Sequence, residues 1–306
     1  MPTLAEALTQ GTVVLDGGLG TLLEARGHDL TSHLWTARLL RDDPGAVRRA
    51  HEAYFAAGAR VAISGSYQVS YEGLRAVGLA HDEVDALLAS SVEIARDARD
   101  EAGLRADEAW VAASVGPYGA ARADGSEYTG DYGMTVAELR EWHRPRLEAL
   151  AATGADVLAV ETIPSLAEVE AITAELAALD VPAWVSMTVD DDGSLRTGES
   201  LAEAAAVAAS LPRLVAVGLN CCDPRGIADA LRVLAGATDA PLVVYPNSGE
   251  VWRASERRWS GDGGGLADQA AAWRAAGARG IGGCCRVGPE EIAAIATRIA
   301  RRSRIR

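Results

Sequence analysis

The four cysteines of this 306-residue chain fall into two adjacent pairs, and each pair follows a short apolar segment. Cys221 and Cys222 form the first pair, and Cys284 and Cys285 form the second. A thiolate binds zinc at a distance of about 2.3 Å, and zinc prefers four ligands arranged as a tetrahedron. A lone buried cysteine is often an inert core residue, but two such pairs after two strand-like segments predict a zinc site.

The backbone limits how many of these thiols can reach one ion, because adjacent residues of a strand point to opposite faces. Gly282 and Gly283 precede the second pair and give the chain the freedom to leave strand geometry there. Two consecutive ligands from each of two strands are hard to build, so we expect one of Cys221 and Cys222 to point away. The predicted site therefore has three protein thiolates and a fourth position open for a substrate thiol.

The charged residues narrow the chemistry further. All 29 basic residues are arginines, which excludes a Schiff-base lysine, a pyridoxal-phosphate lysine and a P-loop lysine. The net charge of −14 argues against a nucleic acid or an anionic membrane as a partner. The chain has no apolar run of membrane-spanning length and no signal-like N-terminus. We therefore expect a cytoplasmic protein, in which cysteine pairs indicate metal binding or catalysis rather than disulfides.

The histidines offer no competing metal site. They lie on predicted helices or early loops, and we expect each to be an ordinary surface or capping residue: His28, His33, His51, His81 and His143. The chain has no H-E-x-x-H motif. A zinc hydrolase would normally use histidine and carboxylate ligands, so the histidine positions argue against that class of enzyme.

The thiols need strands whose ends meet, and the sequence predicts eight such strands. Short apolar runs occur at Val13–Asp16, Arg60–Gly65, Trp110–Val115, Asp156–Glu161, Ala183–Thr188, Leu214–Asn220, Leu242–Pro246 and Arg279–Cys284. Helical patterns occur at Pro44–Ala57, Asp82–Ala102, Thr135–Thr153, Ser165–Leu179, Ser200–Ser210, Pro224–Leu234, Leu266–Ala276 and Pro289–Arg302. This alternation indicates βαβ units and a parallel sheet. Eight units predict an α/β fold, a TIM barrel in a single domain over residues 1–306. A doubly wound open sheet is the alternative, since periodicity alone does not separate the two.

A barrel makes one more prediction, because the active sites of TIM barrels lie at the carboxyl ends of the strands. Polar residues do gather after the predicted strands, at Asp16, Ser64–Gln68, Glu161, Asn220 and Asn247. Long insertions, Gly116–Gly133 and Asn247–Gly265, follow the third and seventh strands. We expect the site to be built from these segments.

Two carboxylates stand out at these strand ends, Asp16 and Glu161. A buried carboxylate needs a partner, which is either an arginine or the ammonium group of a substrate. Asp16 is followed by Gly17 and Gly18, but this turn fails the dinucleotide-binding fingerprint because Leu23 stands where the third glycine belongs. The glycine turn can still offer backbone N–H groups to a carboxylate.

Taken together, these residues resemble the homocysteine S-methyltransferases that use S-methylmethionine or S-adenosylmethionine. The chain resembles, more distantly, betaine–homocysteine methyltransferase and the homocysteine-binding module of cobalamin-dependent methionine synthase. The matching motifs are Asp16-Gly17-Gly18, Leu34–Leu40, Ser66-Tyr67-Gln68, Ser126–Tyr132, His143–Arg146, Glu161–Ser165, Gly218–Cys221, Tyr245–Glu250 and Gly282–Arg286. The family fold is a TIM barrel, in agreement with the strand count.

The resemblance implies a role for each matching residue at the metal. The zinc ligands would be Cys221, Cys284 and Cys285, and Cys222 would have no metal role. The cofactor implied is Zn²⁺, and no nucleic acid or membrane is implied as a partner.

The resemblance also implies how the substrates bind. Asp16 and Glu161 would hold the ammonium group of homocysteine, the amides of Gly17 and Gly18 would receive its carboxylate, and Asn220 belongs with these substrate-binding residues. On the donor side we expect Trp35 and Tyr67, with Asp131 and Asn247 as candidates for the polar tail of the donor.

The implied reaction is methyl transfer from a sulfonium donor to homocysteine, which yields methionine. S-methylmethionine is the expected donor and S-adenosylmethionine the second choice, since the betaine enzyme carries a long C-terminal extension. Two alternatives stay open at this point: a betaine-dependent methyltransferase, and a non-catalytic zinc-binding or thiol-binding protein with a closed four-cysteine site.

Overall fold

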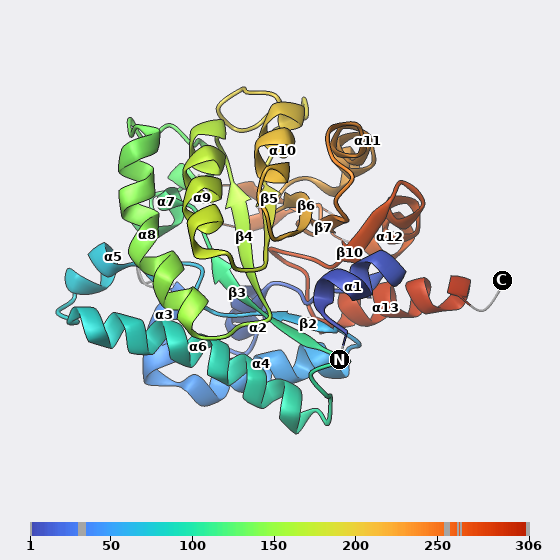
Figure 1. Cartoon of the computed structure of the whole chain (residues 1–306). Coiled ribbons are helices and arrows are strands. Elements are labelled where there is room, and N and C mark those ends of the chain that lie inside the picture. The colour runs from blue at the N-terminus through green and yellow to red at the C-terminus, as the bar shows by residue number, and fades with distance from the viewer. Residues whose placement is uncertain (1, 30–34, 254–257, 262, 264, 304–306) are drawn as a thin grey trace.

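Eight parallel strands close into a barrel in the computed structural model, which describes residues 2–29, 35–253, 258–261, 263 and 265–303 (Figure 1). The strands are β1 (Val13–Val14), β2 (Val61–Ile63), β3 (Trp110–Val115), β4 (Val157–Ile163), β5 (Ala183–Met187), β6 (Leu214–Asn220), β7 (Leu242–Tyr245) and β10 (Ala278–Ile281). Each strand pairs with its neighbour in chain order, and β10 pairs with both β7 and β1. Leu15 forms a parallel bridge to Val61, which joins the two ends of the sheet. The predicted TIM barrel is confirmed, and the open sheet is wrong.

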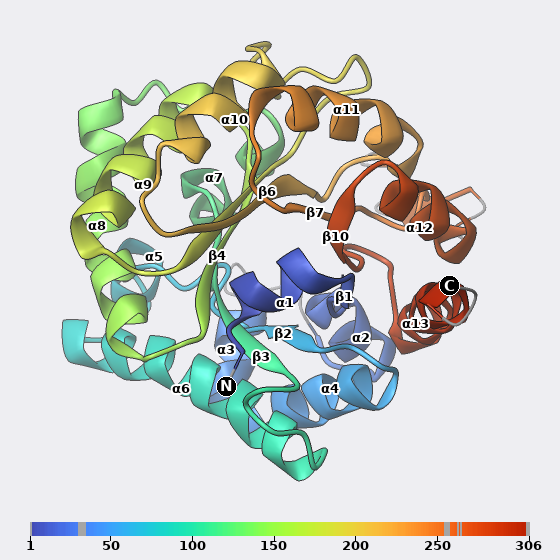
Figure 2. The same ribbon diagram turned by 45° about the vertical axis from the view of Figure 1, so that its right-hand side comes forward.

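Helices surround the barrel and connect successive strands (Figures 1 and 2). The predicted helices appear as α4 (Pro44–Ala56), α6 (His81–Glu101), α8 (Val136–Ala152), α9 (Leu166–Leu179), α10 (Leu201–Ala209), α11 (Ile227–Ala237), α12 (Leu266–Ala275) and α13 (Pro289–Ser303). Further short helices are α1 (Leu4–Gln10), α2 (Leu19–Ala25), α3 (Trp35–Asp42), α5 (Tyr71–Arg75), α7 (Tyr118–Arg122) and the 3-10 turns η1 (Ser126–Tyr128) and η2 (Pro224–Gly226). Among the described residues, no helix is long and apolar enough to span a membrane.

The strands are apolar on both faces because each face packs against a different core. One face packs against the helices, and the other fills the barrel interior with Leu15, Trp110, Trp184, Val243 and their neighbours. Helix α1 covers one end of the barrel, where its buried Leu4 and Leu8 join the interior core (Figure 2). The opposite end, at the carboxyl ends of the strands, carries the polar residues.

The loop after β3 carries α7 and η1, and a buried polar network holds it in place. The Glu168 carboxylate on α9 accepts hydrogen bonds from the backbone N–H of Tyr118 at 2.6 Å and from His143 Nε2 at 2.8 Å. Arg146 donates to His143 Nδ1 at 3.2 Å and also to the Gly116 carbonyl. All three network side chains are buried. The loop after β7 instead forms an antiparallel hairpin of β8 (Val251–Arg253) and β9 (Arg258–Ser260).

Candidate metal centre and substrate site

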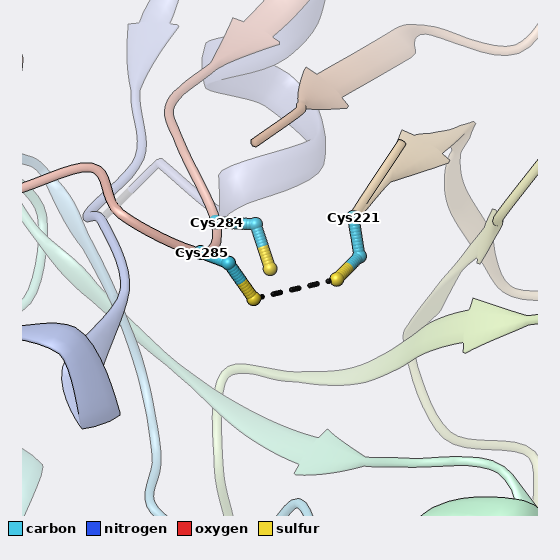
Figure 3. Close-up of side chains that lie close together, drawn as sticks. All are labelled: Cys221, Cys284 and Cys285. Carbon is cyan, nitrogen blue, oxygen red and sulfur yellow. Dashed lines mark hydrogen bonds between the residues drawn. The ribbon is translucent and has the colours of Figure 1, made fainter. Parts of the chain in front are cut away.

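Three of the four thiols meet at the carboxyl end of the barrel. The Sγ atoms of Cys221, Cys284 and Cys285 all lie within 4.8 Å of one another. Cys221 Sγ and Cys285 Sγ are 3.6 Å apart. Figure 3 shows the three side chains converging, Cys221 from the end of β6 and the other two from the turn after β10.

The backbone separates Cys221 from Cys222 in the way the sequence led us to expect. Cys221 has a left-handed conformation with φ of 52°, so the chain leaves strand geometry at this residue. Cys222 is 2% exposed and packs in the core between the barrel and its helices. Burial raises the pKa of the Cys222 thiol to about 12, as expected for an inert core thiol. Cys222 therefore lies apart from the three-thiol cluster.

The turn that carries Cys284 and Cys285 is held by residues that follow β7. Cys284 N donates to the Pro246 carbonyl at 2.8 Å, and Cys285 N donates to Asn247 Oδ1 at 3.1 Å. The Asn247 side chain therefore holds the turn that carries Cys284 and Cys285, and its predicted contact with the donor stays a prediction.

Glycines let this turn pack closely against the segment after β1. Arg286 is the left-handed non-glycine residue of this turn, and neither Gly282 nor Gly283 has a positive φ. A Cβ on Gly282 would lie 2.6 Å from the Asp16 carbonyl oxygen, so the site needs glycine there to allow close packing. The chain leaves strand geometry at these glycines, as predicted, since β10 ends at Ile281.

The three thiols form a donor set that fits a zinc ion. Tetrahedral ligands about 2.3 Å from zinc lie about 3.8 Å from one another, which is close to the observed 3.6 Å for Cys221 and Cys285. Without a cation, the three thiols share hydrogen bonds that lower the pKa of Cys285 and raise that of Cys284. They cannot all ionise at this spacing unless a cation is present. Cys284 and Cys285 are only partly buried, which leaves one side of the cluster accessible.

Asp16 and Glu161 form a pair of buried carboxylates beside the thiols. Asp16 Oδ2 accepts a hydrogen bond from Ile63 N at 2.8 Å, while the buried Asp16 Oδ1 has no partner among the described residues. Burial raises the pKa of Asp16 well above its usual range, and the charge of Glu161 adds to this shift. Glu161 accepts a hydrogen bond from Ser114. Burial, opposed by hydrogen bonds from Ser114 and Tyr245, raises the pKa of Glu161 to about 7.

No described arginine pairs with Asp16 or Glu161, so an arginine partner does not explain why these carboxylates are buried. Two buried carboxylates near one another, one of which has an oxygen unpartnered among the described residues, suit a bound ammonium group. The site can therefore take a cationic group next to a sulfur ligand.

The remaining predicted substrate residues are distributed around this pair. Gly18 N donates to the Val287 carbonyl at 3.0 Å, so this amide is already occupied, whereas Gly17 N has no acceptor among the described residues. Tyr67 is half-buried, and burial raises its pKa well above its usual range, with Cys221 adding to the effect. The Asn220 side chain bonds to Thr162 through both its oxygen and its nitrogen. Of the two amides predicted to receive the carboxylate, that of Gly17 is the one without a protein acceptor among the described residues.

The part of the chain that the structure describes gives no contacts that test the donor-side roles predicted for Trp35 and Asp131. Trp35 begins α3, but its side chain lies outside the described residues. Asp131 is exposed. The donor role of Trp35 therefore stays a prediction.

The structure adds two residues that the sequence analysis did not assign, both on η1. The Tyr128 hydroxyl lies 3.2 Å from Cys221 Sγ. Glu127 is 8% exposed, and burial raises its pKa to about 7. The motif Ser126–Tyr132 contains both residues, but nothing in its spacing indicates which side chains turn inward.

The expectation for two of the histidines is wrong. His51 and His143 are both fully buried rather than at the surface. His143 is buried because it bridges Glu168 and Arg146 in the network that holds the loop after β3. His51 faces the core from α4, and neither of its ring nitrogens has a partner among the described residues.

Comparisons with known proteins agree with this geometry. The family model for homocysteine S-methyltransferase matches residues 13–299. The chain is 46% identical to homocysteine S-methyltransferase of Escherichia coli over 297 residues, which covers 94% of this chain and 96% of that protein. It is 45% identical to homocysteine S-methyltransferase 4 of Zea mays over 304 residues, 94% of this chain and 89% of that one.

Solved structures give the same result. The metallated form of the Escherichia coli homocysteine methyltransferase MmuM superimposes with a TM-score of 0.86 at 43% identity, covering 96% of this chain and 99% of that chain. The chain therefore belongs to the homocysteine S-methyltransferase family.

Proposed function

We propose that this protein transfers a methyl group from a sulfonium donor to the thiolate of homocysteine, with S-methylmethionine as the first donor and S-adenosylmethionine as the second. The observation that carries the proposal is the meeting of three thiols with two buried carboxylates that lack a protein cation. An amino acid with a thiol matches both halves of this site. The relatives, which are named homocysteine S-methyltransferases, support methyl transfer to homocysteine.

The chain's own residues bind and orient homocysteine. Asp16 and Glu161 would hold its ammonium group, since both are buried and neither is neutralised by an arginine. The free N–H of Gly17 would receive its carboxylate. This binding would direct the thiol toward the accessible side of the cysteine cluster.

Zinc is the metal that this donor set favours, with Cys221, Cys284 and Cys285 as ligands and one position left for substrate. Zinc bound there would lower the pKa of the substrate thiol and maintain it as the nucleophilic thiolate. The solved Escherichia coli relative is described as metallated, which supports a metal at this position.

The reaction balances without a further reagent. A bond forms between the homocysteine sulfur and the methyl carbon, and the bond between that carbon and the sulfonium sulfur breaks. The electron pair of the broken bond stays on the donor sulfur, so S-methylmethionine becomes methionine and homocysteine becomes a second methionine. An anionic sulfur and a cationic sulfonium become neutral products, so a site that excludes water favours the reaction.

A competition assay tests this function. The zinc-loaded protein, homocysteine and equal amounts of S-methylmethionine, S-adenosylmethionine and betaine are mixed under reducing conditions, with a different isotope label on each donor methyl. We expect most of the methionine methyl label to come from S-methylmethionine. A dominant betaine label would overturn the choice of donor, and no methionine from any donor would favour a non-catalytic thiol-binding protein.

A further inference from the structure

Glu127 is a third buried carboxylate of the site, and the protein does not neutralise it. Its side chain is 8% exposed, and its buried Oε2 has no hydrogen-bond partner among the described residues. No described arginine pairs with it, because the nearby Arg122 is held by Asp124. Burying an unpaired carboxylate is costly, and a bound cation would offset that cost.

The position of Glu127 is fixed by close backbone packing. A Cβ on Gly119 would lie 2.8 Å from the Glu127 Cα, so α7 and η1 are in close contact here. The next residue, Tyr128, reaches Cys221 Sγ with its hydroxyl at 3.2 Å. The η1 turn therefore presents Glu127 and Tyr128 at the rim of the thiol cluster.

Glu127 lies on η1 in the loop after β3, whereas Asp16 follows β1 and Glu161 lies on β4. The charge of Glu161 acts on Asp16, whereas the ionisable groups that act on Glu127 are Cys221, which also acts on Glu161, and Asp124. The charge of Glu127 in turn acts on Tyr67 and Cys285. Glu127 and Tyr67 are thus both close to the thiol cluster, and the Tyr67 ring is suited to a sulfonium.

We propose that Glu127 binds the α-ammonium group of the methyl donor, and so selects sulfonium donors that carry an amino group over those that lack one. The inference rests on the proposed function and adds the donor's recognition group. It assigns to Glu127 the role that the sequence analysis considered for the exposed Asp131. S-methylmethionine and S-adenosylmethionine both have the α-ammonium, whereas dimethylsulfonioacetate has a sulfonium and a carboxylate only.

The test pairs one substitution with one change of donor, using the full zinc-loaded chain. Glu127→Gln keeps the size of the side chain and removes its charge. We expect the KM for S-methylmethionine to rise at least tenfold, by about the loss of one charge-assisted contact. The affinity for dimethylsulfonioacetate, measured as its inhibition constant against S-methylmethionine, should change less than about threefold, and so should the KM for homocysteine.

Two further variants and one further readout keep the result interpretable. Asp229→Asn removes the same charge from an exposed position on α11, and should leave every constant unchanged. Asp131→Asn should have a smaller effect than Glu127→Gln. Because an unpaired buried charge is lost, the melting temperature of Glu127→Gln at pH 8 should equal or exceed that of the unmodified protein.

The outcomes separate this inference from the function on which it rests. Equal loss of affinity for both sulfoniums in Glu127→Gln would overturn the ammonium assignment, as would a larger effect of Asp131→Asn. Titration calorimetry with S-methylmethionine gives the same comparison without turnover, and unchanged affinity in folded Glu127→Gln would also overturn it. Failure of the unmodified chain to use either amino-acid sulfonium would instead overturn the proposed function itself.

Discussion

Asn220 clamps Thr162 in a left-handed conformation through two side-chain hydrogen bonds. Asn220 Oδ1 accepts from Thr162 N at 2.7 Å, and Asn220 Nδ2 donates to Thr162 Oγ1 at 2.7 Å. Thr162 has φ of 62°, a conformation that costs about 1–3 kcal/mol for a residue with a side chain. Thr162 follows Glu161, and Asn220 precedes Cys221. The two hydrogen bonds therefore fix the position of the Glu161 carboxylate relative to the Cys221 thiol.

Replacing Asn220 should therefore weaken both stability and catalysis. In Asn220→Ala the buried N–H of Thr162 loses its acceptor, which should lower the free energy of unfolding by about 1–3 kcal/mol. We expect the KM for homocysteine to rise, because Glu161 would no longer be held in position. Urea unfolding and steady-state kinetics check both effects. Asn220→Asp keeps the acceptor oxygen, so its stability should lie between those of the original protein and Asn220→Ala. An Asn220→Ala protein as stable as the original would contradict the role of these hydrogen bonds.

Adjacent cysteines offer a matched test of the metal site. Cys221→Ala should abolish zinc binding and activity, as should Cys284→Ala or Cys285→Ala, because each removes one of three clustered thiols. Cys222→Ala removes only a core side chain, and should keep both zinc and activity with about 1 kcal/mol less stability. Zinc content per chain and a methionine assay measure this. Near one zinc per chain in Cys284→Ala would show that the ligand set is wrong.

Glu161 should matter for homocysteine and much less for the donor. Glu161→Gln removes a buried carboxylate that the substrate ammonium would neutralise. Losing one charge-assisted contact should cost about 1.5–3 kcal/mol of homocysteine binding, with little change in the KM for the donor. Ser114→Ala, which removes a hydrogen bond to Glu161 but no charge, should have a smaller effect. Unchanged homocysteine affinity of Glu161→Gln by calorimetry would rule out the assignment.

Homocysteine binding should also follow the ionisation of Glu161. The pKa of this carboxyl is about 7 in the free protein, and only its ionised form attracts an ammonium group. Affinity should therefore improve roughly tenfold between pH 6 and pH 8, as the ionised fraction rises. Calorimetry across this range, after correction for the thiol of homocysteine itself, makes the measurement. The dependence should flatten in Glu161→Gln, and an equal slope in that variant would point to another group.

His51, which lies away from the site, predicts that the stability of the fold also depends on pH. Burial lowers its pKa to about 4, whereas an unfolded chain would titrate near 6.5. Below pH 6.5, His51 therefore binds a proton in the unfolded chain but not in the folded chain, so stability falls as the pH decreases toward 4. Between pH 7.5 and pH 5 this group should cost roughly 2 kcal/mol. That loss should disappear in His51→Leu, measured by urea unfolding at both pH values, and its persistence would exclude His51 as the cause.

Local patterns in the sequence were sufficient to predict the barrel. Each strand is a short apolar run because it packs on both faces, and this pattern does not depend on distant residues. Helix α1 and the β8–β9 hairpin were missed, since a seven-residue helix and three-residue strands give little periodicity. The capping box of Thr3 and Glu6 was the available signal for α1.

The site was predictable where a residue type alone implies its chemistry, as with the clustered thiols. It was not predictable where tertiary contacts decide a side chain's role. Asn247 holds Cys285 N, and Glu127 is turned inward by a loop that Glu168 and His143 anchor from other helices. Residues brought together from such distant segments leave no spacing in the sequence that would reveal their contacts.

The most direct test of the account is the number of sulfur ligands around zinc, counted by X-ray absorption before and after homocysteine is added. We predict three sulfurs and one lighter atom in the free protein, from Cys221, Cys284 and Cys285, and four sulfurs once homocysteine is bound. Four sulfurs before substrate, or an unchanged count after saturation with homocysteine, would contradict a metal centre that binds the substrate thiol.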